Sequence, residues 1–155
     1  MQTRTLTVAL LLIALIPNMA GQQQQRSALL PAHEAKAVSN RYSRERSEKI
    51  KGSWQPTKAD LDGLEANLSQ ISDLEIFGWG SKIHIDHPDQ YFRQYVAVLV
   101  DGKRKVFVNA FCDEEPPSNW RDHLFLVADG ATCYWQVLYD PLTQKFSNLR
   151  INARA

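Results

Sequence analysis

The sequence has almost no net charge. It contains 18 lysine and arginine residues against 17 aspartate and glutamate residues. If the first 20 residues are removed, Arg4 is lost with no acidic residue, which leaves 17 charges of each sign. This balance argues against general binding to nucleic acid or to a membrane surface, because both need an excess of positive charge. We expect the mature chain to be a monomer that binds neither nucleic acid nor a membrane.

Catalytic motifs are also scarce. No serine lies in a nucleophile elbow, and the acidic pair Glu114 and Glu115 is adjacent in one predicted loop, with no partner at general-acid spacing. No motif predicts a cofactor. The sequence therefore favours a protein that is not an enzyme, although a pocket between helix and sheet is left open as a site for a small enzyme or a ligand carrier.

Long apolar runs are limited to the start of the chain. Arg4 is followed by an uncharged run from Leu6 to Ile16, and small residues follow at Ala20 and Gly21. The run is too short for a transmembrane helix, which needs about 20 apolar residues. The layout is typical of a signal peptide over residues 1–20, cleaved near Ala20 and Gly21. We therefore expect a secreted or periplasmic protein with no membrane span in its mature form.

Residues 21–53 are basic and contain few aromatic residues. Seven lysines and arginines stand against three glutamates, a balance of +4 (Arg26, Lys36, Arg41, Arg44, Arg46, Lys49 and Lys51 against Glu34, Glu45 and Glu48). Such a composition buries too little apolar surface to offset chain entropy, so it predicts a flexible leader. The leader is interpreted either as a solvated spacer or as a dock for an anionic surface.

Residues 54–155 are predicted to form the folded domain, which opens with a helix. Thr57 and Asp60 have the spacing of a variant capping box. Four apolar residues follow at spacings of three and four, which places them on one helix stripe (Leu61, Leu64, Leu68 and Ile71). The pattern predicts an amphipathic helix over residues 57–71.

Two β-hairpins are predicted after this helix. The first has arms in 91–100 and 105–112 around Asp101-Gly102, and the second has arms in 133–140 and 145–152 around Pro141-Leu142. Alternation also predicts a first strand over 81–86, and LFLVA at 124–128 suggests a short extra strand. Both faces of 92–100 are apolar, so this strand is expected to be central.

The two cysteines, Cys112 and Cys133, each lie at a predicted strand end that faces the same loop. Antiparallel pairing would bring these ends together, and an oxidising compartment would favour a disulfide. Two buried free thiols are the alternative.

One stretch suggests metal chemistry. His84, Asp86 and His87 offer two imidazoles and a carboxylate that could hold a divalent ion. In an extended strand, however, His87 would point away from the other two. A solvated strand end is the alternative.

Tryptophans suggest a second kind of site. Trp79, Trp120 and Trp135, with Trp54, could form a platform on which sugar rings stack. Aromatic residues at strand spacing more commonly belong to the core.

One helix followed by antiparallel strands resembles the cystatin-like and nuclear-transport-factor-like folds. The segments YFRQYVAV, KVFVNAFC and DGATCYWQVLYDPLTQKFSNLRINARA resemble a group of short secreted bacterial proteins of unassigned function. The resemblance implies an α+β fold, in which one amphipathic helix packs on a curved antiparallel sheet of four to five strands, and it implies export but no activity. The function expected is that of a small binding or interaction domain for an unknown protein or envelope polymer. An inhibitor of a secreted hydrolase, acting through its hairpin tips, is the alternative.

Overall fold

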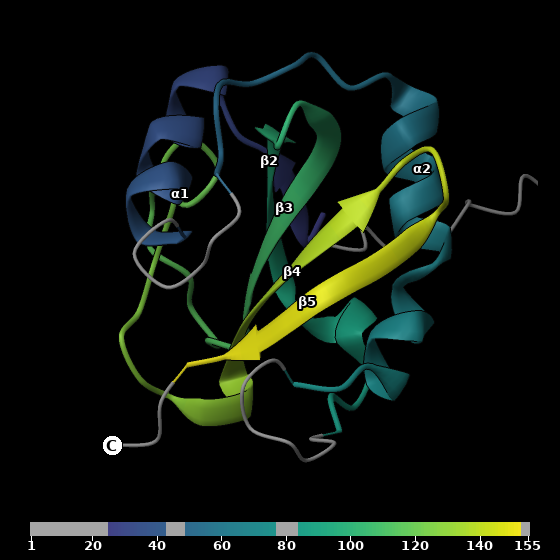
Figure 1. Cartoon of the computed structure of the whole chain (residues 1–155). Helices are drawn as coiled ribbons and strands as arrows, with labels where there is room; N and C mark the ends of the chain where they lie inside the picture. The colour runs from purple at the N-terminus through teal and green to yellow at the C-terminus, as the bar shows by residue number, and fades with distance from the viewer. Residues whose placement is uncertain (1–24, 43–48, 77–83, 153–155) are drawn as a thin grey trace, which may run out of the picture.

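The computed structural model describes residues 25–42, 49–76 and 84–152 (Figure 1). Five strands form one sheet in the order β1-β2-β3-β4-β5: β1 Ser27–Leu29, β2 Phe92–Val100, β3 Lys103–Phe111, β4 Tyr134–Asp140 and β5 Lys145–Ile151. The helices are α1 Ala35–Tyr42 and α2 Lys58–Ala66, and the short 3-10 helices are η1 Ala32–Glu34, η2 Leu68–Asp73, η3 Pro88–Gln90 and η4 Ala131–Cys133. The α+β class predicted from the sequence is confirmed.

Both predicted hairpins are present. β2 pairs antiparallel with β3 from Phe92 and Phe111 to Val100 and Lys103, and β4 pairs antiparallel with β5 across an irregularity between Gln136 and Leu138. β3 and β4 also pair antiparallel, which joins the two hairpins into one meander. β2 is an interior strand, as predicted, since β1 and β3 pair with its two edges.

α2 begins as predicted and ends early. Thr57 accepts a hydrogen bond from the Asp60 amide, and the Asp60 carboxylate accepts from the Thr57 amide, so the capping box is complete. The α-helix ends at Ala66, where the Asn67 side chain donates to the Gly63 carbonyl. The chain continues as the 3-10 helix η2, and Leu64, Leu68 and Ile71 are buried. The predicted stripe is therefore formed by two consecutive helices.

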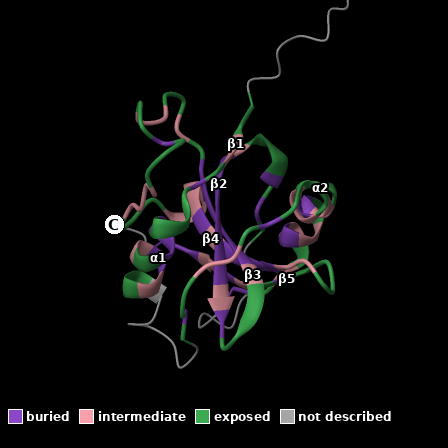
Figure 2. Cartoon of the chain, turned by 90° about the horizontal axis from the view of Figure 1, so that it is seen from above, coloured by how far each residue is buried: buried purple, intermediate pink, exposed green. Residues whose placement is uncertain are grey.

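The sheet is covered on both faces (Figure 1). Residues of α2 and η2 pack against Tyr95, Val106 and Val108 on one face, whereas residues before and within α1 pack against Val96 and Phe107 on the other. Figure 2 shows the buried residues concentrated on the strands between α1 and α2. Coverage on both sides explains why β2 is apolar on both of its faces.

The segment predicted to be a flexible leader is in part folded. β1 pairs with β2 in parallel, from Ser27 with Arg93 to Leu29 with Tyr95, so the sheet is mixed rather than wholly antiparallel. Leu30 and Val38 are buried against the sheet. The structure thus differs from the expectation of a single helix on an antiparallel sheet, because a second helix covers the other face.

The outer edge of β2 is also paired near its C-terminal end. Ile50 forms an antiparallel bridge with Val100, and the Lys51 amide donates to the Leu99 carbonyl at 2.9 Å. Segments 26–30 and 49–52 therefore cover successive parts of one strand edge. Such cover blocks the edge from pairing with another chain.

Two other predicted strands are not borne out. In the predicted strand over 81–86, residues 81–83 lie outside the described residues, and residues 84–87 have no strand structure, although Ile85 is buried. Residues 124–128 form a loop instead of a strand. Side-chain amides on β2, on β3 and just beyond β5 bond the backbone of this region, and a fourth amide on β4 bonds two of these side chains. We call the four the amide row (Gln94, Asn109, Gln136 and Asn152).

Cys112 and Cys133 form the predicted disulfide, with Cα atoms 5.1 Å apart. The bond joins the residue after β3 to the residue before β4, and it closes the loop of residues 113–132. In the entropic account, closing a loop of this size stabilises the fold by about 3 kcal/mol.

Among the described residues, no helix is long and apolar enough to cross a membrane. The predicted signal peptide and its cleavage region at Ala20 and Gly21 lie outside the described residues.

Candidate functional site

A hollow of about 410 Å³ lies where the two hairpin turns meet the start of α2. Its lining residues come from three parts of the chain; we call it the tip hollow (Trp54, Asp60, Lys103, Arg104, Asp140, Pro141 and Leu142). The lining combines apolar side chains with charges of both signs, which are the groups that a binding surface needs.

The two turns are shaped by left-handed residues and a capping carboxylate. Asp101 and Gly102 have φ angles of 47° and 78°, which suits a tight turn between twisted strands. In the second turn, Asp140 Oδ1 accepts from the amides of Leu142 at 2.9 Å and Thr143 at 3.4 Å. This local bonding holds Leu142 at the tip, where its side chain is 91% exposed.

An ion pair crosses from one hairpin to the other below the hollow. Lys105 Nζ lies 2.6 Å from Asp140 Oδ2, and both side chains are mostly shielded from water. Burial alone would raise the pKa of Asp140, but the hydrogen bonds from Lys105 and from the Leu142 and Thr143 amides outweigh it and lower this pKa. Asp140 therefore stays ionised at neutral pH and holds both turns in place.

Trp54 forms the fixed aromatic wall of the hollow. Its indole Nε1 donates to the Lys105 carbonyl at 2.9 Å, and the Arg104 guanidinium lies 5.4 Å from the centre of its ring. The hydrogen bond and the cation–π contact hold the ring in one orientation. The hollow thus brings together an exposed leucine, a fixed indole and the exposed cationic residues Lys103 and Arg104.

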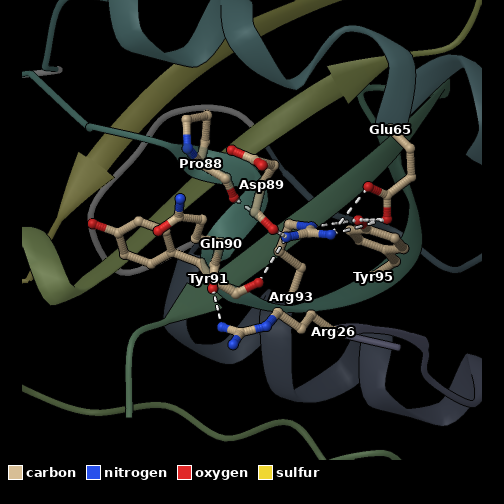
Figure 3. A network of polar contacts seen from close by, with 8 residues as sticks. All are labelled: Arg26, Glu65, Pro88, Asp89, Gln90, Tyr91, Arg93 and Tyr95. Carbon is tan, nitrogen blue, oxygen red and sulfur yellow. Dashed lines mark hydrogen bonds and ion pairs between the residues drawn. The ribbon is translucent and has the colours of Figure 1, made fainter. Parts of the chain in front are cut away.

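A second hollow, of about 420 Å³, lies between α2, η2 and η3. Beside it, Arg93 is buried on β2 and pairs with Glu65 of α2 at 3.1 Å (Figure 3). The Arg93 guanidinium also donates to the Tyr95 hydroxyl and to the carbonyls of Asp89 and Tyr91. A buried charge needs such complete bonding. We therefore interpret the contacts of Arg93 with Glu65 and Tyr95 as a structural clamp between sheet and helix.

The carboxylate of that clamp is already bonded. Tyr95 donates its hydroxyl proton to Glu65 Oε1 at 2.5 Å, and Arg93 donates to Glu65 Oε2. Burial, with Glu65 nearby, raises the pKa of Tyr95 above its ordinary value, so the phenol keeps its proton. Both carboxylate oxygens of Glu65 are therefore occupied by hydrogen bonds, which leaves this group poorly placed to act as a general base.

The predicted metal ligands line the rim of this second hollow. His84 Nε2 lies 2.8 Å from Asp86 Oδ1, and His84 Nδ1 lies 3.3 Å from the Ser72 carbonyl, so both ring nitrogens of His84 have partners. His87 has a left-handed backbone at the start of η3. Within the described residues, His84, Asp86 and His87 do not gather as a three-ligand group.

The predicted tryptophan platform does not form from the described members. Trp120 packs against Phe92 and Phe111 and is 6% exposed, and Trp135 is fully buried. Trp79 lies outside the described residues. Trp120 and Trp135 belong to the core, which is the alternative to a platform given for aromatic residues at strand spacing.

Sequence reasoning named Trp54 and the hairpin tips, but it missed Leu142 and Asp140 as parts of one site. The available signal was a leucine in the polar turn Pro141-Leu142-Thr143-Gln144, where burial is not expected. The contact between the two hairpins depends on their twist, which no local pattern encodes. The chain matches no family model, no curated protein and no solved structure.

Proposed function

We propose that this protein is a small secreted or periplasmic binding module that docks a partner on the tip hollow. The observation that carries the proposal is Leu142, a large apolar side chain that is 91% exposed beside a half-buried indole. Leu142 shares this hollow with Trp54 and two cationic residues, and such a grouping of apolar, aromatic and charged side chains supports a contact with another molecule.

The chemistry of the hollow suits an extended partner with both apolar and anionic groups. Trp54 offers a flat ring, and Lys103 and Arg104 are exposed cations at the same place. An envelope polymer of sugar rings with acidic substituents fits these features. A secreted hydrolase is the second candidate, because both hairpin turns border one hollow and could enter a cleft together.

Two observations support the compartment and the finer fold assignment. The Cys112–Cys133 disulfide is compatible with an oxidising environment outside the cytosol. The antiparallel meander β2 to β5 with α2 across one face supports a cystatin-like or nuclear-transport-factor-like fold, whereas β1 and α1 are additions to it. An experimental structure compared with both folds would test this assignment.

The test of function uses two exposed leucines as a matched pair. Leu142→Asp changes the tip hollow, and Leu29→Asp changes β1, where the leucine is 38% exposed. We expect the wild-type protein and Leu29→Asp to co-sediment with purified peptidoglycan, and Leu142→Asp to stay in solution. Circular dichroism would check that both variants are folded.

The same three proteins distinguish the two candidate partners. If peptidoglycan is not bound but one stoichiometric hydrolase is captured from culture medium by wild type and Leu29→Asp, the inhibitor function is favoured. Equal binding by Leu142→Asp and wild type, to either partner, would contradict the proposal that the tip hollow is the docking site.

A further inference from the structure

Three side chains that can bind a metal meet at the joint between η1 and the disulfide-closed loop. His33 and Glu34 belong to η1, and His123 comes from the loop of residues 113–132. Glu34 Oε1 lies 3.5 Å from His33 Nε2 and 3.2 Å from His123 Nδ1. All three donor atoms lie within 4.8 Å of one another.

These distances suit a small divalent ion. Zinc with ligands at roughly 2.0–2.1 Å in tetrahedral geometry places neighbouring donor atoms about 3.4 Å apart. The two distances to Glu34 are close to this value. The imidazole side chains are 69% and 61% exposed, so small rotations can bring their nitrogens closer together.

The carboxylate is the fixed member of the group. The Glu34 side chain is 11% exposed, and it lies on a 3-10 helix between the buried residues Leu30 and Ala35. A buried carboxylate needs a positive partner. The structure places two histidine nitrogens against it, and a divalent ion held among the three groups would supply the positive charge.

The loop that carries His123 is held by the amide row. Gln94 Nε2 donates to the His123 carbonyl at 2.7 Å and to the Trp120 carbonyl at 2.5 Å. Arg121 donates to the Gln25 carbonyl at 2.8 Å, which ties the same loop to the chain before β1. The backbones that present the ligands are therefore placed by contacts independent of any metal, as in preorganised sites.

We propose that His33, Glu34 and His123 form a zinc site that pins η1 to the loop of residues 113–132. Two imidazoles and one carboxylate are a donor set that zinc accepts readily. Three protein ligands leave the fourth position for water or for a group of a bound partner. The site lies apart from the tip hollow and does not depend on the function proposed above.

No metal was predicted here, since His33 and Glu34 belong to the predicted leader. The two histidines could instead pair with Glu34 as hydrogen-bond donors, with no metal. The two arrangements differ in what a histidine variant does to metal binding, which makes them separable by titration.

The experiment is calorimetric titration of the purified protein with zinc chloride at neutral pH, together with melting curves. We expect heat at micromolar zinc and a raised melting temperature, because the ion binds the folded chain. His33→Ala and His123→Ala should each weaken zinc binding at least about tenfold, since losing a ligand costs no less than losing an outer-shell partner. Magnesium should not compete, because it prefers oxygen ligands.

His84→Ala is the matched control, because it removes an exposed histidine that also pairs with a carboxylate. It should bind zinc as wild type does. Absence of heat and of thermal stabilisation in wild type would overturn the proposal. So would unchanged binding in His33→Ala and His123→Ala, or a loss in His84→Ala alone, which would place the metal in the second hollow. Both site histidines are exposed, so their alanine variants should fold.

Discussion

Two glycines with positive φ angles differ in their surroundings. Gly130 has a φ of 109°, and a Cβ atom there would lie 2.3 Å from the Tyr134 ring, whereas Gly102 has a φ of 78° with nothing within 4 Å. Gly102→Ala should cost about 1 kcal/mol from backbone strain, and Gly130→Ala should cost at least about 2 kcal/mol more, because the ring must move as well. Urea unfolding of both variants would measure the difference. Equal losses in the free energy of unfolding would show that the Tyr134 ring moves at no cost.

The face on which a single side chain lies was predictable where strand alternation decides its burial. Val106 and Val108 face one side of β3 and Phe107 the other, as the pattern indicated. Glu65 lies outside the predicted apolar stripe of α2, yet it contacts Arg93 and Tyr95. That contact depends on where α2 crosses β2, and neither helix periodicity nor strand periodicity carries this information.

At the scale of elements, the amide row replaces a strand. Gln94 bonds the loop backbone at Trp120, His123 and Phe125, whereas Gln136 bonds the side chains of Asn109 and Asn152. The strand expected over 124–128 was wrong for this reason, because side-chain amides supply the hydrogen bonds that a neighbouring strand would have supplied.

Gln94→Leu should therefore free the loop while keeping the volume of the side chain. Each lost hydrogen bond contributes about 1 kcal/mol, so we expect trypsin to cut after the exposed Arg121 at least about tenfold faster. Gln136→Leu is the control and should change the cleavage rate little. A similar acceleration in both variants would mean that the row acts as one unit rather than through Gln94.

Elements with strong local signals were predicted well. The capping box placed the start of α2, and turn residues placed both hairpins. α1 was missed because its apolar residues are few and are embedded in charged sequence. Average composition over residues 21–53 hides the contributions of Leu30, Val38 and Ile50, each of which is buried.

At the scale of the molecule, the folded part of the predicted leader completes one side of the core. Removing residues 22–52 would expose the outer edge of β2 and the sheet face under Leu30, Val38 and Ile50. Burial of one such side chain contributes about 1.5–3 kcal/mol, so we expect the melting temperature to fall by more than about 15 °C.

Two substitutions in α1 test whether the loss of stability comes from lost packing rather than from the shorter chain. Val38→Asp places a charge at a site that is 1% exposed and should reproduce much of the loss, whereas Asn40→Asp at an exposed site should not. Calorimetry on the truncated chain and both variants would measure these effects. A change of only a few degrees on truncation would show that the segment packs loosely.

The parallel pairing of β1 with β2 has a consequence for the order of assembly. Ser27 is made long before its partner Arg93, and the pairing closes a span that contains α1, α2 and the turn into the sheet. Contacts so distant in sequence form slowly, since their loop entropy must be overcome first. A nascent chain therefore presents its first strand without a neighbour until β2 has been made and has reached it.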